Sequence, residues 1–215
     1  MSGKWIDVSM VLKPGMTVWP GDPPFMLEPA ARLEPDGCNT SQISMCTHTG
    51  THLDAAYHYL EDGKQTHEFD MSLFFGEALV YHYVGDRAIG EHELPESALA
   101  PRLLIRTRNS DTTEDGLFRE DYVALDVSAA KKLVRKGVRL IGIDSLSIAT
   151  LDDHDGCTHR VLLEAGIVIV EGLRLGAIPP GMHEFIVLPL ALAGTDGAPC
   201  RAFVRLCTHG GGPRS

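Results

Sequence analysis

Four side chains that can bind metal ions or carry protons fall within eleven positions near residue 50. They are His48, His52, Asp54 and His58, with the spacing H-x3-H-x-D-x3-H. Neutral imidazole and carboxylate groups are natural ligands of zinc and manganese, and the two oxygens of one carboxylate can bridge two ions. A protein core cannot bury such groups unpaired without a desolvation cost of several kcal/mol. The pattern therefore predicts a metal site.

Two local structures would bring the imidazoles of this segment together. Two His four residues apart share one face of a helix, as in the H-E-x-x-H zinc motif. The intervening Thr49-Gly50-Thr51 is a poor helix former, because Gly50 favours backbone angles that other residues avoid. A tight turn that leaves a strand over Ile43–Cys46 would bring both imidazoles to the end of that strand equally well.

A second set of polar side chains lies more than 100 residues further along the chain, with His159 and Glu171 as its main members. His159 falls in the first turn of a helix expected over Thr158–Ala165. Glu171 ends the apolar run Ile167–Val170, and a buried carboxylate at a strand end needs a partner or a metal. Exposure to solvent, or an ion pair with Arg174, would explain Glu171 equally well. We expect the acidic run at residues 152–155 to be a solvated loop.

Short apolar runs rich in β-branched and aromatic residues predict most of the fold. The expected strands are Ile43–Cys46, Ala78–Val84, Leu103–Thr107, Tyr122–Leu125, Val138–Ile143, Ile167–Val170, Phe185–Leu188 and Ala202–Leu206. Helices are expected over Ser128–Lys136, with Ser128 as N-cap, and over Thr158–Ala165. The strand–helix alternation through residues 122–170 predicts some parallel pairing, in an α/β fold with much β that is closed or two-layered.

Proline and glycine break any regular pattern over residues 11–37, which we expect to form a long loop. The loop carries the large apolar residues Trp19 and Phe25, which either cover the core or line a pocket. No linker divides the chain, so we predict one domain over residues 1–207, followed by a flexible Gly-rich tail over residues 208–215.

Composition excludes several classes of function. The 215 residues include 19 Lys and Arg against 29 Asp and Glu, a formal net charge of −10. This balance argues against partners such as nucleic acid and anionic membrane surfaces. The longest apolar stretch, Phe185–Ala193, is far shorter than the ~20 residues of a membrane span, and the first residues lack the apolar core of a signal peptide. We therefore expect a cytoplasmic protein.

Three alternative chemistries find little support in the sequence. The five cysteines include no C-x-x-C pair, which argues against a zinc ribbon or a thioredoxin-like motif. Structural zinc sites, often rich in Cys, close all four positions with protein ligands, so this donor set favours an open, catalytic site over a non-catalytic metal-binding protein. No G-x-S-x-G occurs, which disfavours a serine hydrolase.

The stretch His48-Thr49-Gly50-Thr51-His52-Leu53-Asp54, followed by His58, resembles the signature of the metal-dependent cyclase/hydrolase family, which includes bacterial arylformamidases and isatin hydrolases. The resemblance extends over nearly the whole chain. Its other segments are Asp7-Val8-Ser9, Val18-Trp19-Pro20-Gly21-Asp22, Gly142-Ile143-Asp144-Ser145-Leu146-Ser147 and Ile169-Val170-Glu171-Gly172-Leu173. It implies a swivelling β/β/α domain with a mixed, β-rich sheet, assembled as a homodimer or homotetramer with pockets near the subunit interface.

The resemblance also implies roles for individual residues. Those that match metal ligands are His48, His52, Asp54, His159 and Glu171, with Asp54 shared between two ions, expected to be zinc with manganese as the alternative. His58 matches the catalytic histidine. Trp19 and Phe25 match residues that line the aromatic ring of a small aryl amide substrate.

The implied activity is hydrolysis of a carbon–nitrogen bond other than a peptide bond, by a metal-activated hydroxide. The first expectation is an arylformamidase of tryptophan catabolism that converts N-formyl-L-kynurenine and water to L-kynurenine and formate in the kynurenine pathway. Opening of a cyclic amide such as isatin is the alternative within the same family. His58 would deliver a proton to the departing nitrogen, since an imidazole pKa of ~6.5 suits that transfer.

Overall fold

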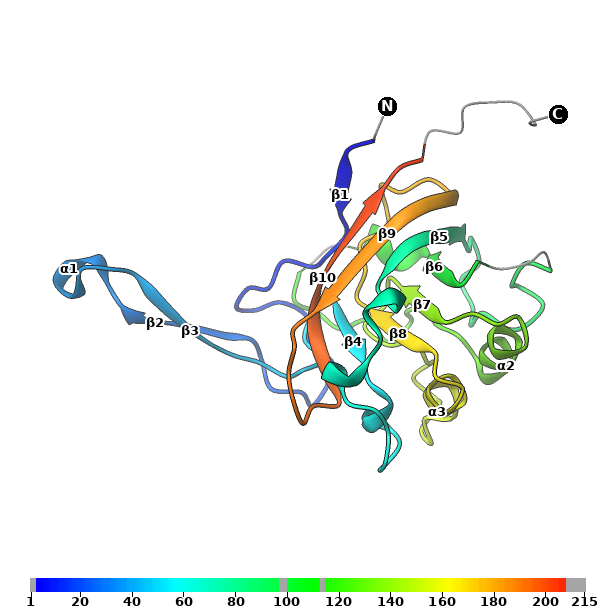
Figure 1. Cartoon of the computed structure of the whole chain (residues 1–215), viewed down its shortest axis with the longest axis horizontal. Coiled ribbons are helices and arrows are strands. Elements are labelled where there is room, and N and C mark those ends of the chain that lie inside the picture. The colour runs from blue at the N-terminus through cyan, green and yellow to red at the C-terminus, as the bar shows by residue number, and fades with distance from the viewer. Residues whose placement is uncertain (1–2, 97–99, 113–114, 208–215) are drawn as a thin grey trace.

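The strands of the protein form one mixed sheet that closes on itself (Figure 1). The computed structural model describes residues 3–96, 100–112 and 115–207. Within them, one sheet has the strand order β1-β10-β4-β8-β7-β6-β5-β9. Its strands are β1 (Trp5–Asp7), β4 (His52–Asp54), β5 (Phe75–His82), β6 (Arg102–Arg106), β7 (Leu140–Ile143), β8 (Val168–Glu171), β9 (Gly181–Pro189) and β10 (Gly197–Arg205).

The closure depends on the long strand β10. Its first residues pair with β4 and its remainder pairs with β9, which closes the sheet, while β1 pairs with the last residues of β10. Strands β5, β6, β7 and β8 run parallel to their neighbours in that series. Strand β4 runs antiparallel to both β8 and β10. The result is a closed, mixed α/β barrel in a single domain, which confirms the predicted fold class.

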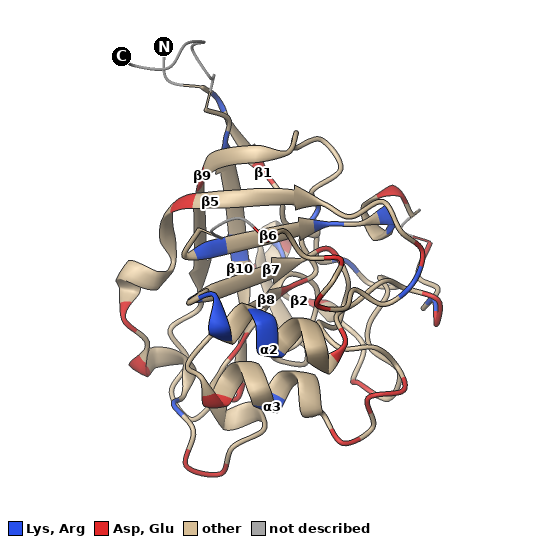
Figure 2. Cartoon of the chain, turned by 90° about the vertical axis from the view of Figure 1, so that its right-hand side faces the viewer, with Lys and Arg blue, Asp and Glu red and all other residues tan. Residues whose placement is uncertain are grey.

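Helices cover only one part of the barrel wall. The α-helices are α1 (Leu33–Asp36), α2 (Val127–Arg135) and α3 (Cys157–Glu164), and the 3-10 turns are η1 (Ala56–His58), η2 (Thr66–Glu68), η3 (Met71–Leu73) and η4 (Arg108–Asp111). In Figure 2, α2 and α3 lie next to β7 and β8, and β5 and β6 are seen above them. Among the described residues, no helix is long and apolar enough to cross a membrane.

Alternate residues of the same strands pack into two separate apolar cores. Leu53 of β4 and Val170 of β8 belong to a cluster with Phe185 of β9, which fills the barrel. Ile169 of β8 belongs to a second cluster with Leu162 of α3, between the barrel wall and the helices. This division follows from the period of two along a strand, which sends neighbouring side chains to opposite faces.

Most predicted elements are found within a few residues of their expected bounds, but one predicted strand and one predicted N-cap are wrong. Tyr122–Leu125 forms no strand, because its backbone makes only isolated bridges through Leu125 to Ile89 and Ala149. Helix α2 is capped by Asp126 rather than Ser128, since the Asp126 carboxylate accepts the backbone N–H groups of Ser128 and Ala129. The predicted tail over residues 208–215 lies outside the described residues.

The expected loop over residues 11–37 contains regular structure that projects from the barrel. Strands β2 (Met26–Ala31) and β3 (Thr40–Ser44) pair antiparallel in a sheet of their own, with α1 between them. We call residues 26–44 the arm; it extends away from the rest of the molecule in Figure 1. The ribbon could not be predicted from the sequence, because proline argues against a strand. Here Pro29 lies inside β2, next to an irregularity in the pairing.

Candidate metal centre

Strands β4 and β8 bring together the two stretches that the sequence singled out. His52 and Glu171 are register partners across this antiparallel pair. The period of two places Asp54 on the same face as His52, while Leu53 enters the barrel core. The tight turn predicted after the Ile43–Cys46 segment is present at residues 47–50, so the helical alternative is wrong.

Two glycines allow the ends of β4 and β8 to approach closely. Gly50 and Gly172 both have positive φ, of 70° and 68°. A Cβ on Gly172 would lie 2.4 Å from the carbonyl oxygen of Gly50, so a side chain there would push the strands apart. The same Gly50 oxygen accepts a hydrogen bond from Nδ1 of His52 at 2.9 Å. This hydrogen bond fixes the orientation of the His52 ring, so that its Nε2 faces Asp54 and Glu171.

Glu171 and His159 form one side of the centre. Nε2 of His52 lies 3.2 Å from Oε2 of Glu171, and Nε2 of His159 lies 3.4 Å from Oε1. The backbone N–H of Ile148 donates to Oε1 of Glu171 at 2.6 Å. Glu171 is only 3% exposed, so its predicted alternative of a solvated strand end is wrong.

His159 is held in place from helix α3 and from an aromatic neighbour. It lies in the first turn of α3, and its ring stacks on Tyr59 with centroids 4.7 Å apart and planes 20° from parallel. Gly156 makes this possible, because a Cβ there would lie 2.1 Å from the Tyr59 ring. The acidic run next to it caps the helix: Asp153 accepts the backbone N–H groups of Cys157 and Thr158.

His48 and Asp54 form the other side of the centre, together with a carboxylate that sequence reasoning missed. Nδ1 of His48 lies 3.0 Å from Oδ1 of Asp54, and its Nε2 lies 3.2 Å from Oδ2 of Asp196. Asp196 also faces His58, with Oδ2 3.7 Å from Nδ1. Asp196 belongs to an Asp-Gly dipeptide, which is typical of an ordinary turn, so no local pattern indicates a role at the centre.

The orphaned atoms of this centre fit divalent cations. Nε2 of His52 and Oδ2 of Asp54 are buried and have no hydrogen-bond partner among the described residues. Two groups of ligand atoms lie close enough to hold ions, and Asp54 belongs to both: His48–Asp54–His58 and His52–Asp54–Glu171. Buried imidazole and carboxylate atoms of this kind suit zinc or manganese. The arrangement agrees with a bridging Asp54, which stays a prediction.

The carboxylates dominate the protonation of the imidazoles they face. Burial opposes the charge on His52, but the nearby carboxylates of Asp54 and Glu171 raise the pKa of His52 to about 10. Burial likewise opposes the charge on His48, and the Asp196 and Asp54 carboxylates raise its pKa to about 10. His58 differs, because burial lowers its pKa below the usual value. His58 is therefore a neutral imidazole at pH 7.

The structure brings all six sequence-predicted polar residues to one centre. The five predicted ligands His48, His52, Asp54, His159 and Glu171 surround it, with His58 at its edge. His58 lies with its ring centroid 4.2 Å from that of His48, within the first ligand group. Its assignment as a proton carrier rather than a ligand stays a prediction.

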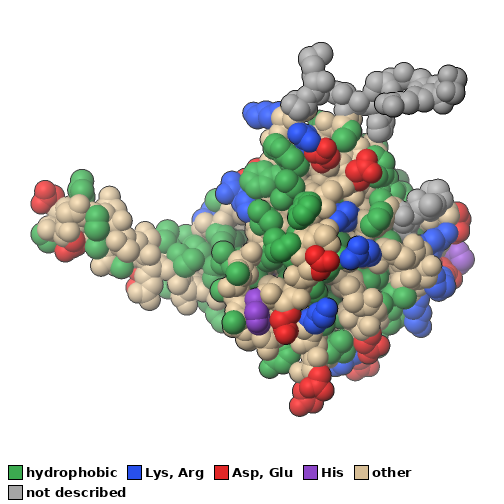
Figure 3. Space-filling model, in the orientation of Figure 1, with side chains coloured by type: hydrophobic (Ala, Val, Ile, Leu, Met, Phe, Trp, Pro, Cys, Tyr) green, Lys and Arg blue, Asp and Glu red, His purple; other side chains and the backbone are tan. Residues whose placement is uncertain are grey.

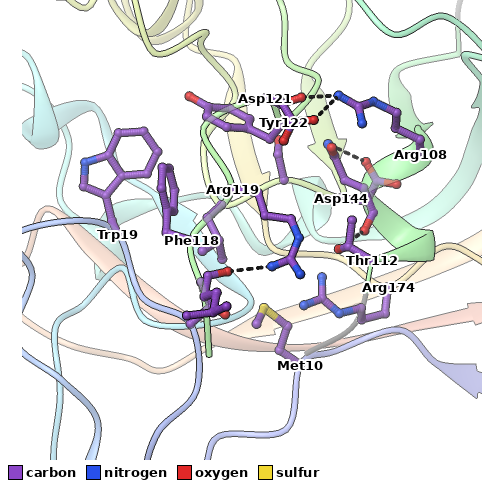
Figure 4. A pocket seen from close by; sticks show the side chains of 15 residues that line it. Met10, Trp19, Arg108, Thr112, Phe118, Arg119, Asp121, Tyr122, Asp144 and Arg174 are labelled. Carbon is purple, nitrogen blue, oxygen red and sulfur yellow. Dashed lines mark hydrogen bonds and ion pairs between the residues drawn. The ribbon is translucent and has the colours of Figure 1, made fainter. Parts of the chain in front are cut away.

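The protein has a cavity of about 370 Å³, the size of a small-molecule site, and its lining includes Ser145, whose carbonyl accepts the N–H of Gly172 (Figure 4). Trp19 lines it, with its ring centroid 5.1 Å from that of Phe118 and 6.0 Å from that of Tyr122. Phe25 does not line the cavity; it is buried against Met10, which does. Trp19 is thus placed to contact a ligand in the cavity, whereas Phe25 packs behind Met10; both substrate contacts stay predictions.

Comparison with known proteins identifies the class of this site. The family profile of the Cyclase family matches residues 6–150. A solved structure titled as a potential metal-dependent hydrolase with cyclase activity superimposes with a TM-score of 0.82 and 31% identity, over 94% of this chain and 97% of that one. A predicted metal-dependent hydrolase from Bacillus stearothermophilus superimposes with a TM-score of 0.81 and 31% identity, over 94% and 98%.

Curated relatives narrow the class further. The kynurenine formamidase of Bacillus cereus is 38% identical over 95% of this chain and 98% of its own length. That of Geobacillus thermodenitrificans is 39% identical over 95% and 99%. Isatin hydrolase A from Labrenzia aggregata, at 22% identity with a TM-score of 0.81 over 94% of this chain and 93% of its own, shares the fold. The chain belongs to the Cyclase family of metal-dependent hydrolases, as its motifs predicted.

Proposed function

We propose that this protein is a metal-dependent aryl formamide hydrolase that converts N-formyl-L-kynurenine and water to L-kynurenine and formate. The observation that carries this proposal is the meeting of His52 and Glu171, with orphaned ligand atoms, beside a cavity with an aromatic wall. The curated relatives over nearly the full length are kynurenine formamidases, which supports the same reaction, a step of tryptophan catabolism.

The chain would hold two divalent ions through His48, His52, Asp54, His159 and Glu171. Such ions lower the pKa of a water from about 15.7 toward 7 and polarise a carbonyl group. We propose zinc, with manganese as the alternative, because nitrogen and oxygen ligands accept both. Asp54 lies between the two sides of the centre, with Oδ1 near His48 and Oδ2 3.7 Å from Nε2 of His159, as a bridging carboxylate should.

His58 would move the proton that the reaction requires. Burial keeps its imidazole neutral at pH 7, so it can accept a proton and then deliver it to the departing nitrogen. Its Nδ1 faces Asp196, which leaves Nε2 for exchange with the substrate. Trp19 and Tyr122 would hold the aromatic ring and exclude water around the formyl group.

Hydrolysis of a cyclic amide such as isatin is the second candidate, favoured by the shared fold with isatin hydrolase A. Assays of the zinc- or manganese-loaded protein on N-formyl-L-kynurenine and on isatin separate the two. We expect kcat/KM to favour the formamide by at least about 100-fold, equivalent to ~3 kcal/mol of transition-state binding. A preference for isatin would reverse the assignment, and turnover of neither substrate would reject both.

We further propose a homodimer, or a homotetramer built from it, in which the arm lies against another copy. Leu27 of β2 and Ile43 of β3 face each other across the ribbon and are 47% and 55% exposed. Figure 3 shows hydrophobic side chains along the arm and at its tip. A two-stranded ribbon is marginally stable by itself, so contact with a second chain would stabilise it. A cytoplasmic location also stays a prediction.

A further inference from the structure

The cavity beside the metal centre is built from the same segments that hold the metal ligands. Tyr122 lines the cavity and donates its hydroxyl proton to the carbonyl of Ala149 at 2.7 Å. The preceding residue, Ile148, donates its N–H to Glu171. Directly after Glu171, the N–H of Gly172 donates to the carbonyl of Ser145, which is another residue of the cavity lining. These hydrogen bonds connect the cavity wall to the segments on either side of Glu171.

Beyond its aromatic wall the cavity carries an ion pair. Arg108 of η4 donates from Nη2 to the carboxylate Oδ2 of Asp121 at 3.0 Å, and also to the backbone carbonyl of Asp121. Asp121 directly precedes Tyr122, so the ion pair lies next to the aromatic wall of the cavity (Figure 4). The side chains of Arg108 and Asp121 are 42% and 72% exposed, which leaves both within reach of a ligand.

The guanidinium of Arg108 has unused hydrogen-bonding capacity. Nε of Arg108 is buried and has no hydrogen-bond partner within the described parts of the chain, although a guanidinium carries five N–H donors. The neighbouring Asp144 does not satisfy it, because its oxygens accept from Thr107 and Ser110. The exposed part of the guanidinium therefore has N–H groups left over from the ion pair, which can donate to an anion in the cavity.

We propose that Arg108 and Asp121 recognise a zwitterionic amino-acid arm on the substrate: Arg108 binds the carboxylate and Asp121 binds the ammonium group. This inference rests on the proposed function and specifies its substrate class, an aryl formamide whose ring carries an α-amino acid arm. The ring lies against Trp19 and Tyr122, with the formyl group toward the metal centre and the arm toward the ion pair. Neutral cyclic amides lack the arm and gain nothing from this pair.

Three probes with the same aryl formamide test the proposal on the metal-loaded enzyme. They are N-formyl-L-kynurenine, the analogue that keeps the carboxylate but lacks the amino group, and N-formyl-2-aminoacetophenone, which lacks both. Arg108→Gln is expected to lower the preference in kcat/KM for both carboxylate probes over the arm-less probe by about 10- to 100-fold, mainly through KM. Asp121→Asn is expected to lower only the preference for the zwitterion over the carboxylate probe, by about tenfold.

Arg135→Gln is the matched control, since Arg135 on α2 pairs with Glu91 in the same way and does not line the cavity. It should leave all three ratios within about twofold of wild type. Calorimetric binding of L-kynurenine and 2-aminoacetophenone to the same variants should follow the same order. Because every readout is a ratio between ligands, partial misfolding of a variant cancels.

The outcomes separate this inference from the function on which it rests. If wild type hydrolyses the arm-less probe as efficiently as N-formyl-L-kynurenine, or if both variants keep the wild-type ratios, arm recognition is overturned and the hydrolase assignment stands. If no formamide probe is hydrolysed, the proposed function fails and the inference fails with it. Selective loss in both variants, with the control unchanged, establishes the recognition.

Discussion

His52 and Glu171 lie directly opposite each other across strands β4 and β8, with Nε2 of the imidazole 3.2 Å from Oε2 of the carboxylate. Both side chains are buried, at 1% and 3% exposure, and removal of charged groups from water costs several kcal/mol each. Such a pair is stable only with further charge compensation. His159 and Asp54 supply part of it, and divalent ions would supply the rest.

Replacement of Asp54 should abolish metal binding. Asp54 belongs to both ligand groups, so Asp54→Ala removes a ligand atom from each. We expect metal affinity to fall by more than the ~10- to 100-fold that loss of an outer hydrogen-bond partner costs. Elemental analysis after dialysis measures the bound metal, with circular dichroism as the check of folding. Wild-type metal content in Asp54→Ala would exclude the bridging role.

Replacement of His58 distinguishes a proton carrier from a ligand. As a proton carrier, His58→Ala should retain its metal and lose about 10²- to 10⁴-fold in kcat, the usual contribution of general acid–base catalysis. The measurements are metal content and turnover of N-formyl-L-kynurenine on the same preparation. A near-wild-type rate would contradict the proton role, and loss of one ion would assign His58 to the ligand group with His48.

Asp196 is expected to position the two imidazoles that it faces. Its Oδ2 lies 3.2 Å from His48 and 3.7 Å from His58, and the adjacent His48 lowers the pKa of Asp196 below its usual range. Asp196→Asn should therefore lower metal affinity or kcat by about 10- to 100-fold.

The control for this variant is Asp7→Asn, which breaks an ion pair with Arg201 on β10, away from the centre. Titration with zinc and steady-state kinetics measure both effects. Identical behaviour of the two variants would show that Asp196 has no positioning role.

Metal uptake should release protons. The pKa of about 10 for His48 and for His52 means that both imidazoles are protonated at pH 7 in the metal-free protein, whereas a metal ligand must be neutral. Apparent metal affinity should therefore rise with pH between about 6.5 and 10. Calorimetric titration in two buffers of different ionisation enthalpy counts the protons, and equal heats in both buffers would contradict the prediction.

The same shifts fix the sign of the pH dependence of folding. His48 and His52 have a pKa of about 10 in the metal-free fold and about 6.5 in the unfolded chain. Their protonation therefore contributes fully to the free energy of unfolding below pH 6.5, and this contribution is lost as the pH rises toward 10. Thermal melting of the metal-free protein should fall over that range. A flat or rising profile would show that the imidazoles do not pair with the carboxylates in solution.

The arm should control assembly. Leu27→Asp with Ile43→Asp places charges on the exposed apolar pair of the ribbon, which should convert a dimer into a monomer in light-scattering measurements. Gln42→Glu adds a charge at the neighbouring position of β3, whose side chain points to the opposite face, and serves as the control. Unchanged mass for the double variant would remove the arm from the interface.

The chemistry of the centre could be predicted from the sequence because it resides in residue types. His48, His52 and Asp54 are close along the chain, and a carboxylate after an apolar strand, as at Glu171, needs a partner wherever it is buried. The helices could also be predicted, because their apolar residues and Gly stops are local signals.

Other features depend on contacts that no local pattern encodes. Strand β4 has three residues, His, Leu and Asp, so nothing in its composition marks a strand. The closure of the barrel depends on pairing of β10 with both β4 and β9, far apart in sequence. Asp196 and the Arg108–Asp121 pair are brought to the site only by this closure and by loop packing.

The most direct test of the central claim is the metal content of purified, zinc-loaded protein, wild type and His52→Ala, determined by elemental analysis after exhaustive dialysis. The account predicts about two ions per wild-type chain, as in two-metal hydrolase sites, and a clear loss in His52→Ala. A wild-type chain that retains no divalent ion, or a His52→Ala chain that retains its full complement, would contradict it.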